Sequence, residues 1–81
     1  MMTNQETVQE RYRRWWEGKY CKLRQNPNGK FKYVQTVEWI GPPSGFYGSV
    51  HLHYIDGTGD RVVAFGVFRP RKSDVIVEGE E

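Results

Sequence analysis

The spacing of apolar residues changes once along the chain, and that change limits the fold more than any other feature. Over residues 3–17 the apolar positions recur at i, i+4, i+7 and i+8, which is typical of one amphipathic helix. From residue 20 onward apolar and polar residues alternate, as in β-strands. A chain of 81 residues is long enough for one small domain and too short for two cores. The apolar stripe of the helix consists of Val8, Tyr12, Trp15 and Trp16.

The predicted helix covers residues 3–17 and has start and stop signals. Thr3 precedes Glu6 at the spacing of a capping box, and Gly18 is a suitable stop. A helix of this length is marginal by itself in water, so its apolar stripe must dock on the rest of the domain.

Five antiparallel strands are predicted, separated by connectors rich in Gly and Pro. In the third strand Val50 and Leu52 share one face, whereas His51 and His53 share the other. Gly66 predicts a bulge in the fourth strand, which is apolar on both faces. We therefore expect a mainly β, α+β domain in which the helix packs on a small, partly open barrel over residues 18–78, followed by an acidic tail at 79–81. The strands are expected at residues 20–25, 30–40, 48–55, 61–69 and 73–77, with positive φ angles at Asn28-Gly29 and Asp56-Gly57.

The strand pattern resembles a Tudor-type member of the SH3-like barrels over about two thirds of the chain. The likeness lies in Gly18–Leu23, in Tyr33–Ile40, in Val50–Gly57 and in the closing Arg69-Pro70. Tudor domains often bind methylated lysine or arginine in an aromatic cage. The resemblance implies that Tyr33 and Tyr54 occupy two cage positions, while Arg24 or Gln25, and Gly57 or Thr58, stand where further rings would be.

Charge is distributed unevenly and points to nucleic acid as the leading partner. The net charge is +2, but residues 1–32 hold eight of the twelve basic residues and three of the ten acids. Basic residues beside aromatic rings suit phosphate contact combined with base stacking. A solvated, partly self-paired surface is the plainer interpretation, and Glu10 is placed to pair with Arg14. The predicted nucleic-acid-binding residues are Arg11, Arg13, Arg14, Lys30, Lys32 and Tyr33.

The alternative is a protein-interaction module. Pro42 and Pro43 stiffen the connector at 41–48, and Phe46 and Tyr47 follow them. Aromatic residues in excess of a small core are preferred interface anchors. The module would form a homodimer or dock on a larger protein, as small phage or plasmid modules do by analogy. The predicted partner-binding residues are Trp39, Phe46, Tyr47 and Tyr54.

Catalysis and metal binding have little support in the sequence. His51 and His53 are spaced for a metal or a proton-transfer pair, which Glu38 could join, but two exposed histidines on a polar strand face are the favoured interpretation. Cys21 is expected to be a small buried residue. We assign no catalytic residue, cofactor or metal. One cysteine and the lack of a long apolar run predict a soluble cytoplasmic chain.

Overall fold

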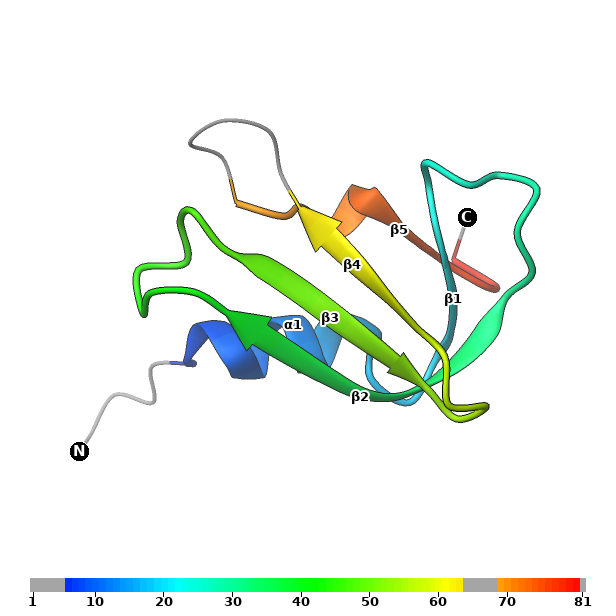
Figure 1. Ribbon diagram of the computed structural model, residues 1–81, viewed down its shortest axis with the longest axis horizontal. Helices are drawn as coiled ribbons and strands as arrows, with labels where there is room; N and C mark the ends of the chain where they lie inside the picture. The colour runs from blue at the N-terminus through cyan, green and yellow to red at the C-terminus, as the bar shows by residue number, and fades with distance from the viewer. Residues whose placement is uncertain (1–5, 64–68, 81) are drawn as a thin grey trace.

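The computed structural model describes residues 6–63 and 69–80, which form one helix, one 3-10 helix and a five-stranded antiparallel sheet (Figure 1). The mainly β, α+β class is therefore confirmed. The elements are α1 (Val8–Trp16), β1 (Tyr20–Leu23), β2 (Lys32–Ile40), β3 (Ser49–Tyr54), β4 (Gly59–Val63), η1 (Lys72–Asp74) and β5 (Val75–Val77).

The helix α1 begins later than predicted, because Thr7 and not Thr3 caps it. The Thr7 hydroxyl accepts a hydrogen bond from the Glu10 backbone N–H at 3.1 Å, and the Glu10 carboxylate accepts from the Thr7 N–H at 2.9 Å. Thr3 and Glu6 have the same capping-box spacing as Thr7 and Glu10, but only Thr7 stands directly before the apolar stripe. Thr3 lies outside the described residues.

The predicted apolar stripe of α1 is confirmed. Tyr12 and Trp16 are fully buried, while Val8 and Trp15 pack against the core from its edge. The Tyr12 hydroxyl donates to the carbonyl of Pro70 at 2.9 Å, which ties the helix to the segment that leads to β5. Burial of this stripe supplies the docking energy that a nine-residue helix needs.

The strands pair in the order β4-β3-β2-β1-β5. The long strand β2 pairs with β1 near its start and with β3 along the rest of its length, and it bends between the two parts (Figure 1). Gln35 is an extra residue at the bend, because Val34 faces Tyr54 while Thr36 already faces His53. Within the described residues no strand pairing joins β4 to β5. The sheet is therefore open, and the predicted barrel is not confirmed.

Side chains from α1 and its C-cap residue form hydrogen bonds with backbone groups of β2 in the part of the strand that β1 does not cover. The Gln9 side-chain amide donates to the Val37 carbonyl at 2.7 Å, and its oxygen accepts from the Trp39 N–H at 2.6 Å. The Glu17 carboxylate accepts from the Val37 N–H at 3.1 Å. Gln9 therefore makes the two bonds that a neighbouring strand would make.

The predicted faces of β1 and β3 are confirmed, whereas in β4 Val62 is buried and Val63 is 52% exposed, and several element ends differ. Val50 and Leu52 are fully buried, as is Cys21. Strand β4 begins at Gly59 rather than at residue 61, and the part of the prediction at residues 64–68, including the bulge at Gly66, lies outside the described residues. Residues 73–74 belong to η1 instead of a strand.

The two turns that were predicted to need positive φ angles differ from each other. Gly57 has a φ of 90°, as predicted, but Asp56 does not have a positive φ, so the prediction for the connection between β3 and β4 holds only at Gly57. Neither Asn28 nor Gly29 has a positive φ, because β1 and β2 are joined by a longer loop instead of a two-residue turn.

Candidate functional site

The predicted basic residues of α1 are largely engaged by acids of the same region. Arg13 Nε lies 3.0 Å from Glu17 Oε1, and Arg14 contacts both carboxylate oxygens of Glu6 at 2.7 and 2.9 Å. The predicted Glu10–Arg14 pair is wrong, because the Glu10 carboxylate caps the helix. The hydrogen bond from Arg14 also lowers the pKa of Glu6.

Lys30 and Lys32 have different surroundings. Lys32 Nζ lies 3.2 Å from Asp56 Oδ2 and donates to the Thr58 hydroxyl at 3.0 Å. Hydrogen bonds from Thr58, followed by that from Lys32, lower the pKa of Asp56 to about 2. Lys30 is exposed and has no ion pair with any described residue. Of the two predicted lysines, Lys30 is the one whose charge is unneutralised.

Aromatic rings and a cation gather on the outer side of β1 and the start of β2. Tyr20 and Tyr33 are partners in the strand register, and their rings meet edge to face at 5.3 Å between centroids. Lys22 Nζ lies 4.6 Å from the centroid of the Phe31 ring and donates to a backbone carbonyl. We call Tyr20, Lys22, Phe31 and Tyr33 the ring–cation face.

The pleat of the strands explains which residues reach this face. Cys21 alternates with Tyr20 and is fully buried, and burial raises the pKa of its thiol to about 11. Lys32 alternates with Tyr33, and its ammonium lies 5.5 Å from the centroid of the buried Tyr54 ring. Tyr20 is 52% exposed, whereas Lys22, Phe31 and Tyr33 are half-buried, so the face is most open to solvent at Tyr20. Lys22 carries no ion pair with a described residue, which leaves its charge available to an anion.

The predicted partner-binding residues have different environments in the structure. The Trp39 ring stacks on Tyr12 at 5.5 Å, and its N–H donates to the carbonyl of Pro42 at 3.0 Å. Phe46 is 40% exposed and Tyr47 is 71% exposed. Phe46 and Tyr47 therefore remain at the surface, whereas Trp39 fixes the base of their loop to the helix.

Tyr54 belongs to the core. Its side chain is 4% exposed, and its hydroxyl donates to Asp60 Oδ2 at 2.6 Å. Burial, followed by this hydrogen bond, strongly raises the pKa of Tyr54. The two rings that the Tudor resemblance assigns to a cage therefore have different environments. The Tyr33 ring contacts the exposed Tyr20, whereas the Tyr54 ring is buried.

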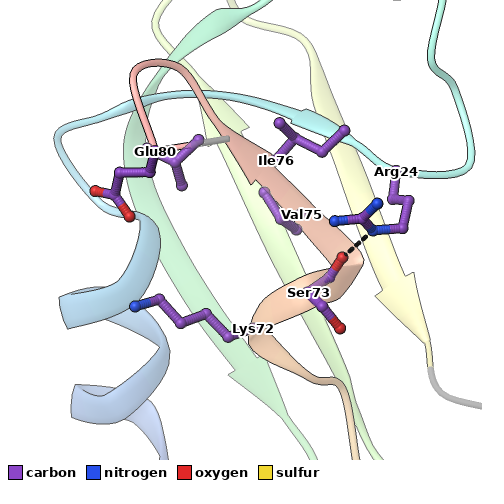
Figure 2. Close-up of a pocket in the computed structure, with 7 residues that line it drawn as sticks. Arg24, Lys72, Ser73, Val75, Ile76 and Glu80 are labelled. Carbon is purple, nitrogen blue, oxygen red and sulfur yellow. Dashed lines mark hydrogen bonds between the residues drawn. The ribbon is translucent and has the colours of Figure 1, made fainter.

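A hollow of about 400 Å³ lies where the end of β1 meets η1 and β5 (Figure 2). Arg24 lies at one side of it and donates a hydrogen bond to the backbone carbonyl of Ser73, and Glu80 lies at the other side. No sequence pattern indicated this hollow, because its walls come from segments about fifty residues apart in the chain. Its lining consists of Arg24, Lys72, Ser73, Val75, Ile76, Val77 and Glu80.

Strand pairing also brings together Glu38, His51 and His53 on the polar side of β2 and β3. One ligand-capable atom from each residue lies within 4.8 Å of the others. His53 Nε2 is 3.3 Å from Glu38 Oε1, and Arg61 Nε donates to His51 Nε2 at 2.8 Å. The sequence indicated this juxtaposition through the alternate spacing of the histidines.

No family model matches the chain, and comparison with curated proteins and with solved structures found no match. Among the described residues, no helix has both the length and the apolar character needed to cross a membrane. The functional conclusion therefore depends on the geometry of the surfaces described above.

Proposed function

We propose that the chain is a non-catalytic binding module that binds single-stranded nucleic acid on the ring–cation face. The observation that carries this proposal is the contact of the exposed Tyr20 ring with the half-buried Tyr33 ring, beside the Lys22–Phe31 pair. Bases stack on aromatic rings whatever their sequence, with about 1–3 kcal/mol per base, and lysines beside the rings attract the phosphates.

The other cations have an auxiliary role in this proposal. Lys30 adds an unneutralised charge next to Phe31. Arg13 and Arg14 lie in exposed ion pairs, so their charges are partly neutralised and contribute less to phosphate contact than the charge of Lys22. Arg11 is half-buried on the same helix and makes no ion pair within the described part of the chain.

We further propose that the module is related in fold to the Tudor-type SH3-like barrels and acts in the cytoplasm. The strand order β4-β3-β2-β1-β5 and the bend in β2 support the relation in fold. A methyl-lysine or methyl-arginine cage is not part of the proposal, because the Tyr54 ring is buried. The single buried cysteine suits a reducing compartment.

Fluorescence anisotropy of a labelled single-stranded oligonucleotide tests the proposal. We expect binding at low salt that weakens steeply as salt rises, because each phosphate contact adds about 0.7 to the slope of log K against log salt. Tyr20→Ala should weaken binding about 5–160-fold, which corresponds to the loss of one stacked base. Lys22→Ala should weaken binding and reduce the salt slope by about one contact.

Lys32→Ala is the matched control for Lys22→Ala. Both remove one lysine from neighbouring strands, but the Lys32 ammonium is already paired with Asp56. Circular dichroism of each variant checks that the fold is intact. Absence of binding at low salt, or equal losses from Lys22→Ala and Lys32→Ala together with no loss from Tyr20→Ala, would overturn the proposal.

A protein-interaction function is the second candidate, and the loop after β2 favours it. Phe46 is exposed with the Arg69 guanidinium 5.1 Å from its ring centroid, and Tyr47 beside it is held at a φ of 58°. Aromatic residues with arginine are common interface anchors. Light scattering after size exclusion would show a homodimer that Phe46→Ala with Tyr47→Ala converts to a monomer, whereas a monomeric wild type removes the homodimer form of this candidate.

A further inference from the structure

We propose that Glu38, His51 and His53 form a binding site for one divalent transition-metal ion of the zinc class. The site lies on the polar side of β2 and β3, apart from the ring–cation face, so it does not depend on the nucleic-acid proposal. It takes two imidazole nitrogens and one carboxylate oxygen from the chain.

The strand pairing fixes the positions of the three ligands. Glu38 is directly opposite His51 in the register of β2 and β3, and His53 is the next residue of β3 on the same side. Leu52, between the two histidines, is fully buried and anchors the strand in the core. The backbone of the site is therefore held by the middle of the sheet and not by a loop, which favours a fixed ligand geometry.

The distances already approach those of a coordinated ion. Ligands about 2.0–2.1 Å from a tetrahedral zinc ion lie about 3.3–3.4 Å apart. His53 Nε2 and Glu38 Oε1 are separated by 3.3 Å, and no pair of ligand atoms in the group exceeds 4.8 Å. Rotation of the His51 ring, together with adjustment of the exposed Glu38 and His53 side chains, can close the remaining gap.

The donor set selects the class of metal. Imidazole with one carboxylate suits zinc, nickel and cobalt, whereas calcium and magnesium prefer oxygen ligands throughout. Three protein ligands leave a fourth position for water or for a donor atom of a bound molecule. A hollow of about 310 Å³ beside His51 and His53, lined also by Asp60 and Arg61, provides room for that ligand.

Arg61 competes with the ion. Its Nε donates to His51 Nε2 at 2.8 Å, so its guanidinium occupies the lone pair that the metal needs and places a positive charge at the site. Arg61 is exposed and can move outward. Removing it should therefore tighten metal binding, an outcome that a merely structural cluster of side chains would not produce.

Isothermal titration of the untagged full chain with zinc tests the site. We expect one ion per chain, at least about tenfold weaker binding in His53→Ala and in Glu38→Gln, and tighter binding in Arg61→Gln. The chain has no other histidine, and its one cysteine is buried, so binding elsewhere would have to use carboxylates alone. His53 and Glu38 are exposed, so circular dichroism should show intact variants.

Nitrogen NMR of the histidine rings provides the second measurement. Zinc should shift one ring nitrogen of each of His51 and His53 in the same titration. Absence of zinc binding, binding that His53→Ala leaves unchanged, or ring nitrogens that do not respond to zinc would each overturn the proposal.

Discussion

Replacement of Gln9 by Ala should destabilise the protein by about 2–4 kcal/mol. The Gln9 side chain bonds to the Val37 carbonyl and to the Trp39 N–H, and both bonds are partly buried. Truncation leaves two backbone groups without partners in the space between α1 and β2, and each such group costs about 1–2 kcal/mol, the lower part of the usual range, because both are only partly buried. A domain of this size has a total stability of about 4–12 kcal/mol, so the loss is a large fraction of it.

Urea denaturation followed by tryptophan fluorescence measures this loss. With an m-value of about 1–1.5 kcal/mol/M, the midpoint of Gln9→Ala should fall by about 2 M urea. Gln25→Ala makes the same chemical change at an exposed loop position and should stay within about 0.5 kcal/mol of the wild type. Equal urea midpoints for the two variants would show that the hydrogen bonds of Gln9 to Val37 and Trp39 do not stabilise the fold as proposed.

Three further predictions concern titratable groups. Folding lowers the pKa of Asp56 from 3.8 to about 2, so its contribution to stability is present above pH 4 and is lost as the pH falls toward 2. The free energy of unfolding of Asp56→Asn, measured by urea denaturation, should therefore decrease less than that of the wild type between pH 4 and pH 2. Cys21 should react with a thiol reagent at mildly alkaline pH far more slowly in the folded than in the urea-unfolded chain, because its pKa is about 11. Tyr54→Phe should cost about 1–2 kcal/mol in urea denaturation, since the bond to Asp60 is lost.

The helix was largely predictable because its apolar period depends on residues within the helix itself. Tyr12 and Trp16 are buried as the period predicts. The predicted start was wrong because Thr3 and Thr7 both precede a glutamate at capping-box spacing, and the helix uses Thr7, which stands directly before Val8 of the apolar stripe.

Strand faces were predictable for the same reason, whereas contacts across strands were not. Alternation placed Cys21 and Leu52 inside without knowledge of pairing. Two features depend on the lengths and register of distant strands, which no local pattern contains. They are the lack of pairing between β4 and β5 within the described residues and the part of β2 that Gln9 covers.

The candidate site was predicted in part. Lys30 and Tyr33 were recognised because they stand near Phe31 in the sequence. Tyr20 and Lys22 were missed because they reach the same surface only through the pairing of β1 with β2. Alternation along the first strand could have identified them in part. Because Cys21 points into the core, Tyr20 and Lys22 on either side of it must point outward.

The most direct test of the proposed binding face is a proton–nitrogen correlation spectrum of the labelled chain with an added single-stranded oligonucleotide at low salt. We predict that the largest shifts fall on Tyr20, Lys22, Phe31 and Tyr33, and that they fade as salt is raised. Shifts confined to the loop that carries Phe46, or no shifts at all, would contradict the account.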